Sequence, residues 1–242
     1  MNRQLRPLDD IAALGRILTV WAHPDDETYL AGGVMAMARH LGQPVTCVTA
    51  TPGDHADSEE KRNVAGRTRT AELALALGIL GIDDTVQLGI RDGECAHFDD
   101  EVAAELIGAV ICDRRPDTII TFGPDGFTGH PDHRTVNRWV TRAAAATRHR
   151  GRMLFPGSTS ARAAESRDID ARFGVFEAGL PTIYAPDELA LVVRVDGVWI
   201  DRKLRALRAH RSQTAAIIGA LGEERYRRWV SCELFVEHGA DR

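Results

Sequence analysis

The chain has 242 residues, of which 44% are hydrophobic and 27% are charged, and its formal net charge is −5 at pH 7. This composition is ordinary for a globular protein and argues against disorder, and the modest negative charge does not favour a general nucleic-acid binder. The length suits a single α/β domain with extensions. We therefore expect one domain over residues 1–242 that buries a large core.

The start of the sequence carries no pattern typical of an export signal. Residues Met1–Arg6 lead into Asp9 and Asp10 rather than into an apolar segment with a small-residue cleavage site, and no apolar run reaches membrane-spanning length. The four cysteines are Cys47, Cys95, Cys112 and Cys232. They form no CxxC pair, which fits reduced thiols better than a disulfide framework. We expect a cytoplasmic protein without a membrane partner.

Apolar runs typical of strands alternate with helical patterns through roughly the first 150 residues. The expected strands are Arg16–Ala22, Val45–Ala50, Thr85–Leu88 and Thr118–Phe122. The helices expected between them are Thr28–Leu41, Glu59–Leu77 and Asp99–Cys112. Each of these helices is followed by a glycine or a proline, which favours a helix end. The alternation is the pattern of βαβ units and predicts an α/β fold with a mostly parallel sheet flanked by helices.

The second part of the chain has a different pattern. Residues 147–187 are rich in Arg, Gly, Ser and Pro, and we expect loops there with one or two short strands. Regular elements are then expected at Glu188–Val195 (strand), Ile200–Ala209, Thr214–Leu221 and Glu223–Val230 (helices) and Glu233–Val236 (strand). The basic side chains of the first of these helices, which include Lys203, are expected to form a solvated face. Residues 151–242 would thus be a smaller α/β extension of a core formed by residues 1–150.

Two clusters of histidines and acids follow strand-like runs. His23–Glu27 has the sequence HPDDE and follows the first expected strand, and Gly129–His133 has the sequence GHPDH and comes shortly after the fourth. Sheets built from βαβ units bind their ligands outside the carboxyl ends of the strands. Both clusters should therefore line one cleft. No GxGxxG or Walker A pattern is present, so the sequence does not indicate a dinucleotide or nucleotide site.

The residue types in the two clusters favour a metal site. A catalytic zinc ion usually takes three protein ligands and keeps one position for water. In the first cluster the carboxylates of Asp25 and Asp26 cannot easily point the same way, so one can bind a metal while the other faces the water. In the second cluster Pro131 fits the first position of a helix, which places His133 in its first turn and His130 at its cap. Burying so many titratable groups without a metal or a substrate would be costly.

These motifs resemble those of the LmbE-like, or PIG-L, zinc-dependent deacetylases. Members of that family remove N-acetyl groups from glucosamine-containing substrates, such as precursors of mycothiol, bacillithiol and glycosylphosphatidylinositol. Besides HPDDE and HPDH, the resemblance includes Arg69–Leu73, Leu88–Gly93 and His210–Gln213. The segment Asp125–Thr128 lacks the tyrosine that some mycothiol-pathway members have there, which keeps the substrate open within the wider family.

The resemblance implies a Rossmann-like fold and a role for each matching residue. The residues that match zinc ligands are His23, Asp26 and His133. Asp25 matches the general base, and His130 matches the group that stabilises the oxyanion and is a candidate to protonate the leaving amine. Asp132 matches a residue that orients His130. The residues that match sugar-binding positions are Arg69 and Asp92. The implied cofactor is Zn²⁺, although two histidines and a carboxylate also suit Fe²⁺ or another divalent metal.

The expected function is metal-dependent hydrolysis of an N-acetyl or N-acyl group on a small glucosamine-type substrate by a metal-activated water. Other hydrolase functions remain open, namely an amidase acting on a thiol conjugate or a tailoring deacetylase of a glycosylated natural product. A non-catalytic sugar-binding protein is disfavoured, because binding alone does not need a base such as Asp25. We expect no nucleic-acid partner. The sequence leaves open whether the chain forms homo-oligomers, which sugar and aglycone it binds, and what Glu27 does.

Overall fold

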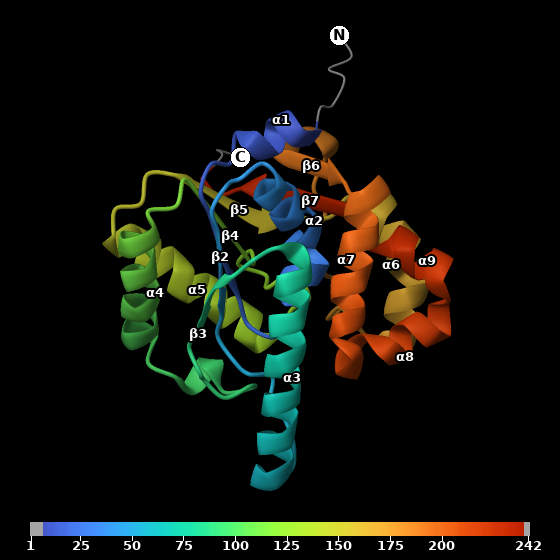
Figure 1. Cartoon of the computed structure of the whole chain (residues 1–242), viewed down its shortest axis with the longest axis horizontal. Coiled ribbons are helices and arrows are strands. Elements are labelled where there is room, and N and C mark those ends of the chain that lie inside the picture. Colours follow the sequence, from blue (N-terminus) through green and yellow to red (C-terminus); the bar gives the residue numbers. More distant parts are fainter. Residues whose placement is uncertain (1–6, 240–242) are drawn as a thin grey trace.

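A mixed, mostly parallel sheet forms the centre of the computed structural model, which describes residues 7–239 (Figure 1). Within this range seven strands pair in the order β3-β2-β1-β4-β5-β7-β6. Their bounds are β1 Ile17–Trp21, β2 Val45–Thr49, β3 Asp84–Gln87, β4 Thr118–Thr121, β5 Arg152–Pro156, β6 Leu191–Arg194 and β7 Cys232–Glu237. The first five are parallel, and β7 is antiparallel to both of its neighbours. The expected α/β fold is confirmed.

Helices cover both faces of the sheet. Their bounds are α1 Pro7–Ala12, α2 Asp26–His40, α3 Glu59–Leu80, α4 Asp100–Arg114, α5 Pro131–Ala146, α6 Ser160–Phe173, α7 Gly197–Ala209, α8 Arg211–Leu221 and α9 Glu223–Trp229, with short 3₁₀ turns η1 Cys95–His97 and η2 Pro186–Glu188. In Figure 1, α4 and α5 lie to the left of β2 and β4, whereas α3 and α7 lie to the right. Every residue of β1, β2 and β4 is buried, as expected for parallel strands between two helical layers.

The strand order creates a crevice at one point of the sheet. β1 pairs with β2 on one side and with β4 on the other. The chain leaves β1 toward α2, but it leaves β4 toward α5, which lies on the opposite side of the sheet in Figure 1. The two following loops therefore separate at the carboxyl ends of β1 and β4, which is the usual ligand position in such sheets. Both predicted clusters span the end of one of these loops and the first turn of the helix that follows, α2 or α5.

The expectations from the sequence are wrong or incomplete at two places in the described residues. Residues 147–187 contain the expected short strand, β5, but also the helix α6, which begins after the cap residue Thr159 and ends at Gly174. In α6 the buried residues are Ser166 and Ile169, so the helix has almost no apolar periodicity to reveal it. The short helix α1 was also not expected. The N-terminal segment Met1–Arg6, on which the expectation about export rests, lies outside the described residues.

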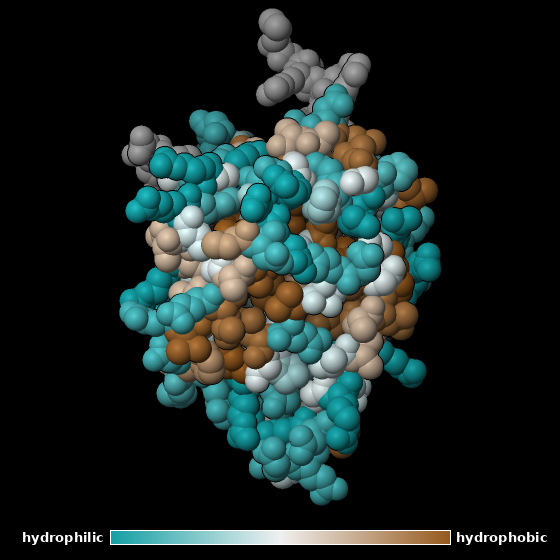
Figure 2. Space-filling view, turned by 60° about the vertical axis from the view of Figure 1, so that its left-hand side comes forward, coloured by the Kyte–Doolittle hydropathy of each residue, from teal (hydrophilic) through white to brown (hydrophobic). Residues whose placement is uncertain are grey.

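The surface is largely hydrophilic at the lower end of the molecule. Figure 2 shows hydrophobic residues gathered in the middle of one face, with hydrophilic residues below them. The lower end is formed by the first turns of α3, which begin with the charged residues Glu59, Glu60, Lys61 and Arg62. Within residues 7–239 no helix has both the length and the apolar character needed to cross a membrane.

A buried ion pair joins α7 to the sheet. Lys203 Nζ lies 2.6 Å from Glu233 Oε1 and 2.8 Å from the carbonyl oxygen of Tyr29, and both charged side chains are almost fully buried. Glu233 also accepts hydrogen bonds from the backbone N–H groups of Gly33 and Val34. Burial lowers the pKa of Lys203. The expected solvated face is therefore wrong for Lys203, because its amine pairs with a carboxylate of a distant strand.

We predict that Lys203→Met lowers the free energy of unfolding by about 3 kcal/mol or more, because it leaves the Glu233 carboxylate buried without its cationic partner. Urea unfolding followed by circular dichroism would measure this loss. The matched control is Arg205→Met, an exposed position on the same helix, where a change within about 0.5 kcal/mol is expected. Equal stabilities of the two variants would contradict the prediction.

Candidate active site

The first cluster forms a tight turn between β1 and α2. Asp25 has a φ of 116°, in the left-handed region that side chains other than glycine rarely adopt. Its carbonyl oxygen accepts hydrogen bonds from the backbone N–H groups of Thr28 and Tyr29, which starts the helix. Asp26, the first residue of α2, accepts a hydrogen bond from the backbone N–H of His23 at 2.8 Å. The turn therefore directs the side chains of Asp25 and Asp26 differently.

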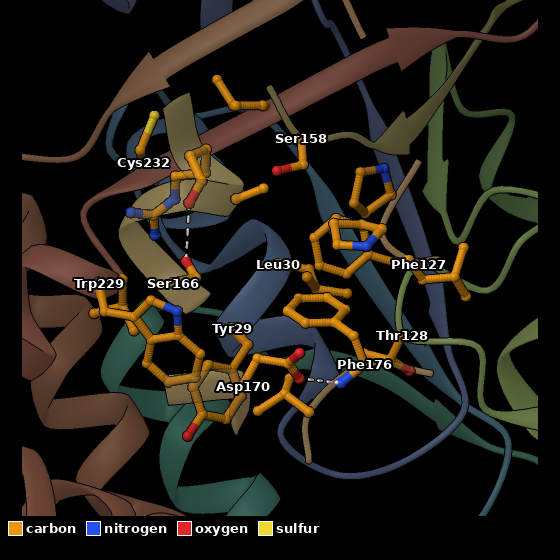
Figure 3. Close-up of a pocket in the computed structure, with 18 of the residues that line it drawn as sticks. Tyr29, Leu30, Phe127, Thr128, Ser158, Ser166, Asp170, Phe176, Trp229 and Cys232 are labelled. Carbon is orange, nitrogen blue, oxygen red and sulfur yellow. Dashed lines mark hydrogen bonds between the residues drawn. The ribbon is translucent and has the colours of Figure 1, made fainter. Parts of the chain in front are cut away.

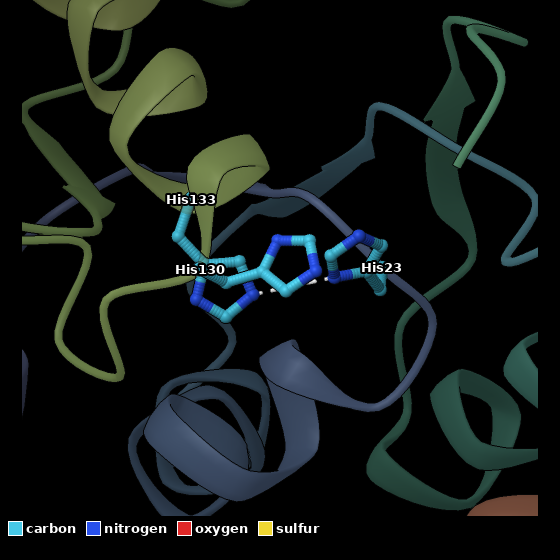
Figure 4. Close-up of side chains that lie close together, drawn as sticks. All are labelled: His23, His130 and His133. Atoms are coloured by element: carbon cyan, nitrogen blue, oxygen red, sulfur yellow. Dashed lines mark hydrogen bonds between the residues drawn. The ribbon is translucent and has the colours of Figure 1, made fainter. Parts of the chain in front are cut away.

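Three of the predicted site residues bring ligand-type atoms together. His133 Nε2 lies 3.2 Å from His23 Nδ1 and 3.4 Å from Asp26 Oδ1, and His23 Nδ1 lies 3.6 Å from Asp26 Oδ2. Figure 4 shows the rings of His23 and His133 facing each other beside His130. Ligand atoms about 2.0–2.2 Å from a tetrahedral metal ion would stand about 3.3–3.6 Å apart. The two ring nitrogens thus stand at a spacing that suits one metal ion, and Asp26 turns a different oxygen toward each of them.

The other nitrogen of each ring is fixed by a protein group. His23 Nε2 lies 3.0 Å from Asp92 Oδ1 and 3.2 Å from Asp132 Oδ2. His133 Nδ1 lies 3.0 Å from the carbonyl oxygen of Gly126 and 3.1 Å from Thr128 Oγ1. Such outer contacts are typical of metal-binding histidines, because they fix the ring and the tautomer. They turn His23 Nδ1 and His133 Nε2 toward Asp26.

Within residues 7–239, two groups of side chains place one ligand atom from each member close enough together for a single ion. His130 has a ring nitrogen within 4.8 Å of ligand atoms of His23 and His133, and Asp92 and Asp132 form a further group with His23. In that further group, however, Asp132 already accepts hydrogen bonds from the backbone N–H groups of Gly93 (2.8 Å) and Cys95 (3.2 Å). We interpret it as the support of His23 rather than as a separate site.

Asp132 and His130 are linked differently from the expectation. The carboxylate of Asp132, which was expected to orient His130, is fully buried and contacts His23 instead. The link to His130 runs through the backbone, because the N–H of Asp132 donates to His130 Nδ1 at 3.2 Å. Since Nδ1 accepts this bond, the proton of the neutral ring is on Nε2. The Nε2–H group of His130 is therefore the donor that the ring can offer.

Arg69 connects the turns around the cluster. From α3 its guanidinium donates to the carbonyl oxygens of Pro24 (2.9 Å) and Gly53 (3.3 Å). It also lies 3.5 Å from Asp92 Oδ2 and 3.9 Å from Asp25 Oδ2. Gly53 has a φ of +71°, and a Cβ there would come within 2.5 Å of the Arg69 side chain, so this approach requires glycine. Both predicted sugar-binding residues, Arg69 and Asp92, thus adjoin Asp25 or His23.

The crowding of charges shifts the pKa values of the site. Burial by itself lowers the pKa of His23, but the carboxylates of Asp132 and Asp92 raise it to about 10. Burial lowers the pKa of His133 to about 4. Burial and the neighbouring carboxylate of Asp26 raise the pKa of Asp25 to about 7. The site therefore holds an excess of acidic groups that a bound cation would stabilise.

A buried pair that the sequence did not reveal lies beneath the turn. Glu27 Oε2 accepts a hydrogen bond from the backbone N–H of Asp25 at 2.9 Å, and Glu27 Oε1 lies 2.8 Å from His210 Nε2. Both side chains are fully buried. Burial opposes the charge of each group, yet their mutual attraction lowers the pKa of Glu27 and raises that of His210. The pair holds Asp25 in its left-handed conformation and joins HPDDE to the His210–Gln213 segment, a link between residues 183 positions apart that no local pattern encodes.

The fold and the site define an α/β protein with a histidine–carboxylate centre at the switch point of its sheet. The family model described as GlcNAc-PI de-N-acetylase, PIG-L, matches residues 18–144. The chain therefore belongs to the PIG-L, or LmbE-like, family.

Two relatives support this assignment, and a solved structure shares the fold. The chain is 33% identical over 229 residues to a 1D-myo-inositol 2-acetamido-2-deoxy-alpha-D-glucopyranoside deacetylase of Mycobacterium sp. (strain KMS), with 82% of this chain and 74% of the relative covered. It is 32% identical over 207 residues to a probable N-acetyl-alpha-D-glucosaminyl L-malate deacetylase 2 of Bacillus cereus, with 84% and 85% covered. The fold matches N,N'-diacetylchitobiose deacetylase from Pyrococcus horikoshii with a TM-score of 0.66 at 20% identity, covering 97% of this chain and 87% of that one.

We predict that His210→Ala lowers the free energy of unfolding by about 3–5 kcal/mol, because it leaves the Glu27 carboxylate buried without its partner. Thermal or urea unfolding of the metal-free protein would measure the change. Arg211→Ala, at the adjacent exposed position, is the control and should stay within about 0.5 kcal/mol of the parent protein. If both variants unfold at the same urea concentration, the pair does not stabilise the turn as described.

Proposed function

We propose that this protein is a zinc-dependent hydrolase that removes an N-acyl group from a glucosamine-type substrate. The observation that carries the proposal is the convergence of His23 Nδ1 and His133 Nε2, 3.2 Å apart, on the Asp26 carboxylate, whose Oδ1 lies 3.4 Å from His133 and whose Oδ2 lies 3.6 Å from His23. The named relatives support the substrate class, because their names describe deacetylases of N-acetylglucosamine linked to inositol or to malate. The residues that would hold the ion are His23, Asp26 and His133.

A bound divalent ion would supply Lewis-acid chemistry, polarising the amide carbonyl and making a water molecule easier to deprotonate. The ligand set suits Zn²⁺ and also Fe²⁺. Asp25, next to the ligand Asp26, would accept the proton of the attacking water. Its backbone is fixed by Glu27, and Arg69 lies beside its carboxylate, so the base stays in one position. A fixed general base typically contributes a factor of about 10² to 10⁴ to the rate.

His130 would act on the developing oxyanion. Its Nε2–H is the available donor, because Nδ1 accepts the backbone N–H of Asp132. A positioned donor of this kind contributes a factor of about 10² to 10³ to the rate. Collapse of the tetrahedral carbon breaks the C–N bond, and the nitrogen takes up the proton that Asp25 accepted from the water, which releases the carboxylic acid and the free amine. The neutral ring of His130 keeps its Nε2 proton and donates only the hydrogen bond.

Asp92 and Arg69 would hold the sugar beside this centre. One oxygen of Asp92 faces His23 Nε2 and the other faces the guanidinium of Arg69. Asp92 thus contacts both the proposed ligand His23 and Arg69, so a sugar whose hydroxyl groups bind Asp92 and Arg69 would lie next to the metal site. A protein that only binds sugar would gain nothing from Asp25 in a rarely adopted backbone conformation, which costs of order 1–3 kcal/mol.

Variants of the base and of a ligand should separate the two roles. We predict that Asp25→Asn keeps one equivalent of metal after dialysis but hydrolyses N-acetylglucosamine derivatives at least about 10²-fold more slowly. His133→Ala should lose metal affinity by more than the roughly 10- to 100-fold typical of outer contacts. Elemental analysis and release of free amine measure both effects. His40→Ala, at the other end of α2, is the control. If both site variants hydrolyse the substrate at the rate of the parent protein, the roles assigned to Asp25 and His133 are wrong.

Removal of the metal should act on stability as well as on turnover. We predict that a chelator lowers the Tm of the parent protein, because an ion that binds only the native state stabilises it by mass action. The same treatment should leave the Tm of His133→Ala unchanged. Adding Zn²⁺ or Fe²⁺ back, with anaerobic handling for iron, should restore Tm and hydrolysis together. A chelated protein that retains both its Tm and its activity would contradict the metal site.

A further inference from the structure

A cavity of about 530 Å³ adjoins the proposed active site (Figure 3). At one end it reaches Asp26 and Thr128, a partner of His133. From there it extends between α2, α6, α8 and α9. Its apolar wall includes Leu30, Phe127, Phe173, Phe176, Ile217 and Trp229. Leu30 lies one helical turn beyond Asp26 on α2, so the apolar wall begins directly next to a proposed ligand.

Three polar side chains in the wall already have partners in the protein. Ser166 donates to the carbonyl oxygen of Arg162 at 3.1 Å, and Asp170 accepts the backbone N–H of Phe176 at 2.8 Å, as Figure 3 shows. Glu233 is bound by Lys203. A ligand in the cavity therefore meets mainly carbon atoms. A sugar would lose hydration there without gaining hydrogen bonds, whereas a hydrocarbon chain would not.

The position of the cavity indicates which part of the substrate enters it. Arg69 and Asp92, where the sugar would bind, are not among the residues that line it. Asp26 both lines the cavity and faces His23 and His133. An amide held at this centre with its sugar toward Arg69 therefore directs its acyl group into the cavity.

We infer that the substrate carries an N-acyl chain longer than acetyl, with at least about six carbons. This inference rests on the proposed hydrolase function and adds the class of acyl group. Six carbon units, each about as large as a water molecule in the liquid at roughly 30 Å³, need about 180 Å³. The cavity of about 530 Å³ is larger than this and admits the chain, whereas the methyl group of an acetyl would occupy only about 30 Å³ of it.

The test compares acyl lengths on the metal-loaded full chain. N-acetyl-, N-butanoyl- and N-hexanoylglucosamine are incubated with the protein, and release of glucosamine is measured. Burial of one methylene corresponds to a gain of up to about fourfold. We expect kcat/KM to rise at least about tenfold from acetyl to hexanoyl. Hydrolysis of the acetyl substrate with no gain, or with a loss, for hexanoyl overturns the acyl-chain site and leaves the hydrolase function intact.

Two variants connect the gain to the cavity. Ala163→Trp places a large side chain in the cavity wall on α6, and the hexanoyl-to-acetyl ratio of kcat/KM should fall to about 1. Ser166→Phe fills the cavity at a second position and should act in the same direction. Ala164→Trp is the matched control, because this neighbour on α6 is exposed and does not line the cavity, so the ratio should stay at the parent value. A parent-like ratio in both cavity variants contradicts the inference.

A further substrate distinguishes the acyl chain from an apolar aglycone. Hexyl N-acetylglucosaminide carries the same hydrocarbon on the other side of the sugar. A gain with this glycoside and none with N-hexanoylglucosamine would show that the cavity takes the aglycone, which overturns the acyl assignment. If the metal-loaded protein hydrolyses none of these amides, the proposed function itself fails.

Discussion

The confinement of several carboxylates and imidazoles in one crevice is the constraint on which the rest of the structure depends. Asp26, Asp92 and Asp132 surround His23, and all of these side chains are buried or nearly so. Buried charges are costly unless they are paired and hydrogen-bonded. Although burial lowers the pKa of His23, the carboxylates of Asp132 and Asp92 favour its protonated ring and raise the pKa to about 10. The proposed cation would replace that proton as the partner of the acids, which explains why the crevice tolerates so much negative charge.

The scaffold supports the crevice from below with a second buried layer of charge. Glu27 accepts a hydrogen bond from the backbone N–H of Asp25, and the carboxylate of Glu27 pairs with His210 Nε2. A hydrogen bond to a charged group contributes about 1.5–3 kcal/mol, which is comparable to the cost of the left-handed conformation of Asp25. Ser212 of α8 donates to Glu72 of α3 by its backbone N–H and its hydroxyl. The C-terminal helices thus brace the turn that presents the proposed base.

The sequence predicted what depends on local pattern and missed what depends on distant pairing. The alternation of apolar runs located the strands before each cluster, and Pro131 marked the start of α5. The burial of Lys203 and Glu27 was not predictable, because their partners lie 30 and 183 residues away in the sequence. A charged residue whose partner is unknown is expected to be exposed to solvent. Helix α6 was missed for a related reason. It faces a cavity as well as the core, so its inner side lacks the apolar periodicity that marks a packed helix.

The residues proposed for catalysis and most of the residues that line the cavity come from different parts of the chain. The proposed ligands, base and oxyanion donor all follow β1 and β4, in the first 150 residues, whereas most of the cavity wall comes from α6, α8, α9 and the loop after α6. Changes in those later elements can therefore alter the shape of the cavity without moving a ligand atom. Tyr29 and Leu30 are exceptions, because they share α2 with Asp26, and so are Phe127 and Thr128, which lie in the loop between β4 and α5. A larger side chain at Leu30 would press on the turn that carries the base, so the acyl group is best accommodated by small residues on α6, where Ala163 and Ser166 stand.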